Sequence, residues 1–584
     1  MALSTPSASP AVVVKEIDLT GGVPNVQSTT GAIVGNFRWG PAEQRVLIDN
    51  DTKLVDTFAS PDSANTIDFH SASYFLRYSG SLQVVREVTS AAKNARSTIG
   101  QLGTDTNNTL PTPTVKNADD FAAQDASLDS DSHTLIARYP GDLGNSLEVH
   151  VCPPRDSAFS AWAYKDEFDT APGTSSYAST RAASNDEIHV VVIDYDGKLT
   201  GTKGSVLERY PYLSVAKDAK NADGTTNFVE DVINGRSEYI HWVGFDSDYT
   251  TARGNGLVDS GDDFDPGLTT HTAHTFDKGV NSGALGTSEY MQGYDLFEDK
   301  DIVEVDFLIA PSMSSRDAQT SIVNDLIATA QNLRKDCVVT ASPARTDVIN
   351  LTNTATITTN ITTTADTFTN SSYLVADGNF LKVYDKFNDQ YIHIPAASST
   401  AGIMAATDLQ RAPWFSPAGT RRGQYLGITA ISWSPTKAQR DTLYKASVNP
   451  VANIPGQGVL LFGDKTKLGR PSAFDRINVR RLFLVLERAI GKAAEQAMFE
   501  FNDEFTRAEF VNIIEPVLRE VKGRRGITDF KVVCDDTNNT AAVVDRNEFI
   551  ANVFIKPARS INYVTLNFVA VRTGVDFEEV VGTV

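Results

Sequence analysis

The sequence contains very little cysteine. Its three cysteines, Cys152, Cys337 and Cys534, lie far apart in 584 residues, and their spacing fits neither a disulfide framework nor a cysteine-based metal site. We therefore expect buried free thiols in a reducing compartment.

Long apolar runs are also missing. No stretch of about 18 consecutive apolar residues occurs, so the sequence predicts no membrane-spanning helix. The opening MALSTPSASP has no basic segment followed by an apolar core, so no secretory signal is expected. What remains is a composition that is 41% hydrophobic and a length that favours several globular domains.

Basic residues are scarce in the middle of the chain. Residues 101–300 contain 14 Lys and Arg against 33 Asp and Glu, and this segment accounts for most of the net charge of −21. Residues 456–584 are balanced, with 18 of each sign. An acidic exterior repels phosphate backbones and anionic lipids, so we expect no nucleic-acid partner and no membrane insertion.

An apolar stretch stands near the N-terminus, between Pro10 and the turn-rich linker 21–31. Its sequence, AVVVKEIDL (11–19), is rich in β-branched residues and favours a strand. Two interpretations stay open. The stretch is either an edge strand of a sheet within its own chain or a strand donated to a neighbouring subunit.

The middle of the chain predicts an α/β core with a β-rich insertion. An apolar strand (301–311), a helix with an apolar stripe through Ile322 and Leu326, and a second strand (336–343) follow the insertion in order. The low-complexity tract 351–372, rich in Thr and Asn, is expected to form an exposed ribbon or long loop.

The C-terminal third is the most regular part. Apolar residues recur at helical spacing from Val479 to Ala497 and predict one long amphipathic helix. A second helix is expected over about 505–521, perturbed at Pro516. Three strands are expected after it, at 530–535, 549–557 and 562–574.

Residues 456–466, GQGVLLFGDKT, come close to a phosphate-binding loop. Gly458 and Gly463 have the required separation, but Asp464 places a carboxylate where a phosphate would bind. Val459–Phe462 favour a strand, and Gly469 and Pro471 oppose a helix after the loop. We therefore expect no nucleotide there, although a nucleotide-dependent enzyme is kept as the alternative function.

Other chemistry is weakly signalled. Asp259, Asp262, Asp263 and Asp265 depart from the calcium-loop spacing, and His271 and His274 have no supporting helix or Glu. No G-x-S-x-G elbow lies between a strand and a helix. The sequence thus predicts no catalytic residues, no metal, no cofactor and no enzyme.

Three motifs in the C-terminal third form one pattern: the stretch 456–466, the helix that begins NVRRLF (478–483), and FEFN (499–502). Together they resemble the C-terminal signature of contractile tail sheath proteins from myovirus-type bacteriophages. PWFSPAGTRRG (413–423) and DRNEFIA (545–551) resemble the large-phage branch of that family, as do DTNNT (536–540) and KPARSINYVTLNFVA (556–570).

The resemblance continues upstream in order. SPAVVVKEID (9–18) is similar to the family's opening motif, with Ala11 in place of the usual Gly. GNFRWGP (35–41) and residues 75–88 resemble its first folded segment, and 139–149 and 194–214 resemble motifs of its outer domains. Residues 215–300 and 344–372 match loosely.

The fold that this resemblance implies is α+β and multidomain. It has an α/β C-terminal core domain, β-rich inserted outer domains and extended N- and C-terminal arms. The expected divisions are an N-terminal arm (1–22), a middle α/β domain (23–95 with 301–430), an outer inserted domain (96–185), a second inserted domain (186–300), a tube-facing C-terminal domain (431–565) and a C-terminal strand and arm (566–584).

The function that it implies is mechanical. Such subunits polymerise helically around a tail tube in a metastable extended state and contract to drive the tube through the host envelope. The implied partners are other copies of the chain, the tail tube protein, and baseplate and tail terminator proteins. The implied location is the tail of the virion, after assembly in the host cytoplasm. A sheath from a tail-derived bacteriocin or secretion apparatus is the alternative of the same class.

The resemblance also suggests site residues. The N-terminal arm would exchange a strand between subunits through Val12, Val13, Val14, Glu16 and Ile17. The C-terminal arm would do so through Phe568, Val569, Val571, Phe577 and Val580. The candidate tube-facing residues are Arg480, Arg488, Lys492, Lys522, Arg524 and Arg525.

Overall fold

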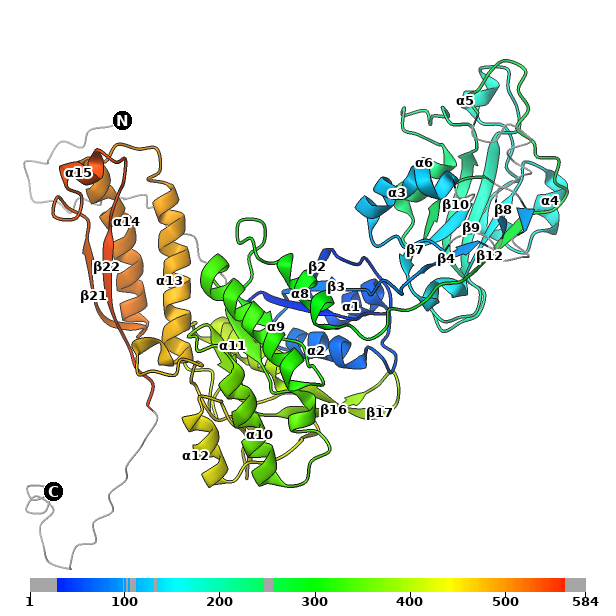
Figure 1. The fold of residues 1–584 in the computed structure, drawn as a ribbon. Helices are drawn as coiled ribbons and strands as arrows, with labels where there is room; N and C mark the ends of the chain where they lie inside the picture. Colours follow the sequence, from blue (N-terminus) through cyan, green and yellow to red (C-terminus); the bar gives the residue numbers. More distant parts are fainter. Residues whose placement is uncertain are drawn as a thin grey trace, which may run out of the picture. The chain divides into compact units, whose positions relative to one another are not determined.

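A computed structural model describes residues 29–97, 99–100, 103–104, 112–130, 134–245 and 256–561 (Figure 1). These residues form two compact units. The core unit comprises the described parts of Val26–Pro413 and Pro417–Arg488, and the C-terminal unit those of Trp414–Ser416 and Ala489–Val584. None of the helices in the described ranges is both long and apolar enough to cross a bilayer. All three cysteines are buried and free, as the sequence predicted.

A six-stranded sheet organises the core unit, in the order β15-β14-β13-β1-β3-β2. All neighbouring strands are parallel except β2, which pairs antiparallel with β3. The parallel strands are short and almost wholly buried, which is typical of a parallel sheet covered on both faces, whereas the edge strand β2 is partly exposed. Their bounds are β1 (Gly31–Gly35), β2 (Arg45–Ile48), β3 (Leu82–Arg86), β13 (Phe307–Ile309), β14 (Val338–Ala341) and β15 (Leu374–Ala376).

Helices pack on both faces of this sheet, because successive strand residues point to opposite sides. Ala32 and Val34 of β1 belong to the apolar cluster that contains α8 (Thr287–Asp295) and α9 (Arg316–Ala328). Ile33 belongs to the other cluster, with α2 (Thr66–Leu76) and α11 (Ala396–Gln410). The remaining helices of this region are α1 (Asp51–Phe58), α10 (Thr354–Thr367) and α12 (Lys437–Lys445).

The Thr-rich tract corrects one prediction, because it forms the helix α10 rather than a loop. The Asn353 side chain caps its first turn by accepting from the amides of Ala355 and Thr356. Ile357 and Ile361 are buried on one face. Burial of this stripe outweighs the modest helix propensity of Thr, whose hydroxyls also bond to carbonyls one turn earlier.

The acidic insertion folds around a seven-stranded sheet with the order β10-β9-β8-β12-β4-β7-β11. Strands from both predicted inserted segments, 96–185 and 186–300, share this one sheet. Its strands are β4 (Asn94–Ser97), β7 (Leu135–Pro140), β8 (Leu147–Cys152), β9 (Glu187–Asp194), β10 (Ser205–Ser214), β11 (Ile240–Trp242) and β12 (Thr272–Asp277). The helices around it are α3 (Ala118–Ser130), α4 (Asp156–Ala161), α5 (Ser176–Ser179) and α6 (Val229–Arg236).

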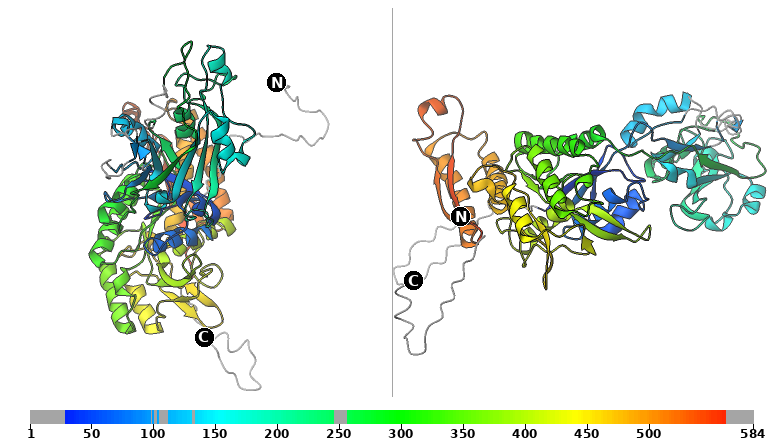
Figure 2. Two further views of the ribbon diagram at one scale, coloured as in Figure 1. Left: turned by 90° about the vertical axis from the view of Figure 1, so that its right-hand side faces the viewer. Right: turned by 60° about the horizontal axis from the view of Figure 1, so that its bottom comes forward.

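The C-terminal third contains the predicted helices. α13 (Ile477–Glu495) buries Val479, Leu482 and Leu486, and the division between the two units falls within it. α14 (Glu504–Gly523) continues through Pro516. The C-terminal unit adds β21 (Ile527–Val533), α15 (Ala541–Val544) and β22 (Asn552–Pro557), which can be followed from two other directions in Figure 2.

The predicted fold class is confirmed, since the described residues form several mixed helix-and-sheet bodies with a sheet-rich insertion. The expected third strand of the C-terminal region (562–574) lies outside the described residues, as do both arms. The predicted domain boundaries stay predictions.

Candidate functional site

The stretch 456–466 begins as a β-hairpin. β19 (Val451–Ile454) pairs antiparallel with β20 (Gly458–Leu461), with Val451 opposite Leu461 and Ile454 opposite Gly458. Gly456 and Gly458 have φ values of 77° and 82°, a backbone region that favours glycine and is suited to a tight turn. The glycines that suggested a phosphate loop therefore shape a hairpin.

Asp464 lies directly after this hairpin and is buried. Its Oδ1 accepts a hydrogen bond from Arg476 Nη1 at 2.8 Å and lies 3.2 Å from the Tyr444 hydroxyl. Its backbone carbonyl accepts from the amide of Ile477 at 2.8 Å, at the start of α13. The carboxylate that argued against phosphate thus joins the hairpin to the helix that follows.

The donors of Lys465 and Thr466 are committed to acceptors within the chain. Lys465 Nζ donates to the Tyr444 carbonyl at 2.7 Å, and its amide donates to Asn449 Oδ1 at 2.9 Å. Thr466 donates from its hydroxyl to the Phe474 carbonyl at 2.7 Å and from its amide to Asp475 at 3.0 Å. This turn therefore connects the hairpin to the residues before α13, and its geometry does not suit phosphate binding.

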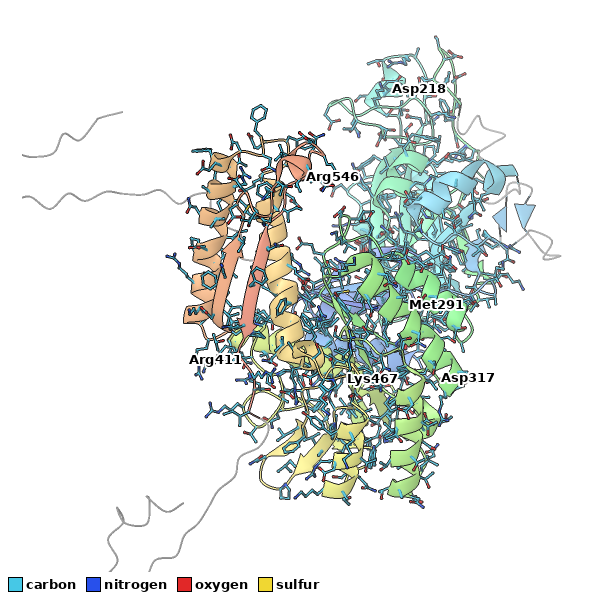
Figure 3. All side chains as sticks on the ribbon, turned by 60° about the vertical axis from the view of Figure 1, so that its left-hand side comes forward. Asp218, Met291, Asp317, Arg411, Lys467 and Arg546 are labelled. Carbon is cyan, nitrogen blue, oxygen red and sulfur yellow. The ribbon has the colours of Figure 1, made fainter. Side chains whose placement is uncertain are left out.

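Lys467, the residue after Thr466, also bonds within the core unit. Its Nζ donates to the Ala446 carbonyl at 3.0 Å, and burial lowers the pKa of its ammonium group. Lys467, labelled in Figure 3, is buried in the core unit. A buried ammonium with a backbone acceptor contributes to packing rather than to ligand capture.

Three arginines fasten the first part of α13 to the core unit. Arg481 forms a two-pronged ion pair with Asp408 and donates to the Met404 carbonyl at 3.0 Å. Arg488 Nη1 lies 2.7 Å from Asp306 Oδ1. Although burial opposes its charge, Arg488 has a raised pKa, because Asp306 and other nearby carboxylates favour the charged form.

Arg480 is held by aromatic rings. Its guanidinium carbon lies 4.3 Å from the centre of the Tyr373 ring and 4.2 Å from that of Phe474, and Nη2 donates to Ser372 Oγ at 2.5 Å. Burial lowers its pKa. Arg480 is buried and Arg488 is largely buried, and both guanidinium groups interact with side chains of the same chain, while their role as tube-facing residues stays a prediction.

The other tube-facing candidates lie closer to solvent. Lys492 is half-buried, and Lys522, Arg524 and Arg525 are exposed. Lys522 Nζ donates to Asp529 Oδ1 at 3.1 Å, and Arg524 Nη1 donates to Glu520 at 3.3 Å. Exposed pairs of this kind contribute little to stability, and their role at a tube stays a prediction.

The sheet of the C-terminal unit has only two strands within the described residues, fewer than a stable sheet usually has. β21 and β22 pair only with each other among the residues that the structure covers, with Lys531 opposite Phe554. A two-stranded sheet has marginal stability by itself, and each strand has an outer edge that can accept another strand. The predicted arm residues, Val12, Val13, Val14, Glu16, Ile17, Phe568, Val569, Val571, Phe577 and Val580, lie outside the described residues.

Sequence patterns missed a group of exposed apolar side chains in the connection from α13 to α14 and in the first turn of α14. Met498, Phe499, Phe501 and Phe505 all project into solvent. The signal that could have found them is the density of apolar residues just after the amphipathic repeat ends at Ala497, where Met498, Phe499, Phe501 and Phe505 stand among charged residues.

The weak metal candidates have other partners. Asp265 forms an ion pair with Arg155 at 2.7 Å, and Asp263 accepts from Asn185. Burial lowers the pKa of His274 to about 4, and its Nδ1 lies 3.1 Å from Ser97 Oγ. No group of three metal-ligating side chains converges within the described ranges.

Comparison with known proteins gives consistent results along the chain. Residues 283–467 match the model of the phage tail sheath protein central domain, and residues 470–570 match that of the phage tail sheath C-terminal domain. The tail sheath protein of Enterobacteria phage T4 is 31% identical, with 98% of this chain and 99% of the relative covered. The tail sheath protein of Vibrio phage KVP40 is 30% identical over the same shares.

Solved structures support the fold. A sheath tail protein of Listeria innocua has a TM-score of 0.54 at 12% identity, covering 92% of this chain and 94% of its own. One from Desulfitobacterium hafniense has a TM-score of 0.51 at 14% identity, covering 94% and 100%. At these identities the likeness concerns the fold alone.

Proposed function

This chain belongs to the phage tail sheath protein family, and from that premise we propose that it is the structural subunit of a contractile tail sheath. Copies polymerise helically around a tail tube in a metastable extended state, and contraction drives the tube through the host envelope. The observation that carries the proposal is the match to phage tail sheath proteins over nearly the full length of both chains. The same match favours a phage tail over a bacteriocin or a secretion apparatus.

The energy for contraction comes from the difference between two packings of the same subunits, summed over many copies. No nucleotide is required, in accord with the structural role of the Asp464 turn. The core unit suits a rigid body that rotates as a whole, because its parallel sheet is buried on both faces and its arginines are internally paired.

Connections between subunits are assigned to the arms. Strands near Val12–Ile17 and beyond Phe568 of neighbouring copies add to the edges of β21 and β22, where main-chain hydrogen bonds supply the affinity. The incomplete two-stranded sheet supports this assignment. Such links hold neighbours together while the core units change their packing.

Further partners follow from the sheath's place in a tail. The candidates for contact with the tube are Arg480, Arg488, Lys492, Lys522, Arg524 and Arg525, and the ends of the polymer meet baseplate and tail terminator proteins. Assembly takes place in the host cytoplasm before the tail becomes part of the virion.

Removal of residues 1–20 tests the function. The truncated chain should remain a folded monomer with the circular dichroism spectrum of the full chain, yet form no cylinders in negative-stain electron micrographs. Full-length protein under the same conditions should give hollow striated cylinders. Cylinders of normal length from the truncated chain would overturn the strand-exchange assignment, and their absence from the full chain would count against polymerisation itself.

A further inference from the structure

The junction between the acidic insertion and the rest of the core unit is densely hydrogen-bonded. The insertion spans residues 88–286, between β3 and α8, and we call the remainder of the core unit the parallel-sheet body. The two segments that cross the junction pair with each other, since the amides of Lys93 and Val280 each donate to the other's carbonyl at 3.0 Å. The Thr89 amide also donates to Ser282 Oγ at 2.9 Å. The two crossings are therefore bonded to each other and do not act as independent linkers.

A loop of the parallel-sheet body reaches into the insertion. It comprises residues 36–43, directly after β1. Trp39 belongs to the apolar cluster of the insertion and meets Tyr139 edge-on, with 5.5 Å between the ring centres. The Ala42 amide donates to the Lys116 carbonyl at 2.9 Å. The loop thus belongs to the parallel-sheet body by sequence and contacts both bodies.

Arg86 joins the two bodies directly. It is the last residue of β3, and its side chain is buried. Its guanidinium group donates to the carbonyls of Phe37 at 2.8 Å and Gly40 at 2.6 Å, both in the loop. The same group donates to the carbonyl of Pro140, in β7 of the insertion, at 2.6 Å. One planar group therefore binds backbone atoms of both bodies.

Stability alone does not account for this arginine. Burial lowers the pKa of Arg86 to about 9, and its acceptors among the described residues are neutral carbonyls. Burying a cation costs free energy, and an apolar side chain of similar volume often stabilises a fold as well or better. The guanidinium group adds direction, because its N–H donors are fixed in one plane.

Close packing at Gly141 supports the same role for the junction. Gly141 has a φ of 146°, and a Cβ atom there would lie 2.9 Å from the carbonyl oxygen of Arg38. The Gly141 amide donates to the Lys93 carbonyl at 3.0 Å, and Arg38 Nε lies 3.4 Å from Asp142 Oδ1. The loop and the insertion therefore meet backbone to backbone, with no room for a side chain at this glycine.

We propose that Arg86 is a positioning residue that fixes the orientation of the insertion on the parallel-sheet body. The two bodies then keep one relative orientation in solution, and the insertion follows each rotation of the parallel-sheet body. In the proposed sheath, the acidic surfaces of neighbouring copies would accordingly move with the bodies that carry them. The coupling is a property of the single subunit, so its test does not depend on the sheath function.

The distance between two spin labels tests this coupling. Ser157→Cys in α4 of the insertion and Ser321→Cys in α9 of the parallel-sheet body place the labels at exposed positions of helices. The three native thiols are buried and react little. Pulsed electron paramagnetic resonance on the full-length double variant should give one narrow distance distribution. Adding Arg86→Met, which removes the donors and keeps an unbranched apolar side chain, should at least double the width of that distribution.

Two further variants accompany this measurement. Arg345→Met is the matched control, because Arg345 is half-buried and donates to the His393 carbonyl at 2.8 Å within the parallel-sheet body. It should leave the distribution unchanged. Arg86→Lys should give an intermediate width, since an ammonium group retains the charge but not the planar set of donors.

Urea denaturation of the same variants separates positioning from stability. A lower free energy of unfolding with an unchanged distance distribution would overturn the proposal and make Arg86 a purely stabilising residue. A broad distribution with Arg86 intact would overturn it as well. If neither substitution of Arg86 gives folded protein, the proposal also fails, because Arg86 would then maintain the fold itself. Each of these results leaves the sheath function intact, whereas failure of the unmodified chain to form cylinders would count against that function alone.

Discussion

The two ends of α13 lead to opposite surroundings. Toward the core unit, the helix carries Arg481, which is buried, and Arg488, which is largely buried, and both pair with carboxylates of that unit. The residues just after its last turn expose Phe499 and Phe501 to solvent. One continuous segment therefore joins a region whose interactions are satisfied within the subunit to a region whose interactions are left open.

This difference separates stability from assembly. Substitutions in the first region should unfold the subunit and affect assembly only through the loss of folded protein. Substitutions in the second region should leave folding unchanged and act on assembly alone.

The largest expected effect follows from Arg481→Ala. Truncation leaves the buried carboxylate of Asp408 without its partner and should lower the free energy of unfolding by about 3–5 kcal/mol. Urea denaturation followed by circular dichroism measures the loss. The double variant Arg481→Leu/Asp408→Leu should recover most of it, because no unpaired charge remains. A single variant as stable as the unmodified chain would show that this pair does not fasten α13.

Asp377 gives a somewhat smaller and pH-dependent effect. Burial raises the pKa of its carboxyl to about 7, against hydrogen bonds from Ser342, Asn379 and Thr400. The folded-state pKa of Asp377 lies above the unfolded value. The contribution of Asp377 to the free energy of unfolding should therefore be most favourable below about pH 4 and should fall as the pH rises to about 7.

Asp377→Asn removes this titration. The variant should gain about 2–4 kcal/mol over the unmodified chain at pH 8, and much less at pH 5, in urea denaturation. Asp366→Asn, at an exposed position of α10, should keep the original pH slope. If the free energy of unfolding depended on pH equally in the unmodified chain and in Asp377→Asn, Asp377 would not be the source of this pH dependence.

Local patterns predicted the elements of both regions but not their surroundings. The apolar repeat from Val479 is strong enough to define α13. Arg480 donates to Ser372, which lies 108 residues away in sequence. The burial of Arg480 therefore depends on the tertiary fold. The Thr-rich α10 was missed for a related reason, since its stability comes from the burial of Ile357 and Ile361.

The smallest effect on stability, and the sharpest test of the division, is expected from Phe499→Gly. Glycine adopts the observed φ of 70° without strain, and the lost ring makes no burial contribution in the isolated subunit. The free energy of unfolding should therefore stay within about 1 kcal/mol of the original value. Cylinder formation, measured by sedimentation, should nevertheless fall at least fivefold if Phe499 contacts a neighbouring copy.

Tyr391→Gly is the matched control for that measurement. Tyr391 is an exposed aromatic residue of the core unit, in β17 (Gln390–Pro395). It should have no comparable effect on cylinder formation. Phe499→Gly subunits that unfold early would place Phe499 among the stabilising residues, and those that assemble normally would remove it from the contact between copies. Only a folded subunit with impaired assembly fits a region left open for its neighbours.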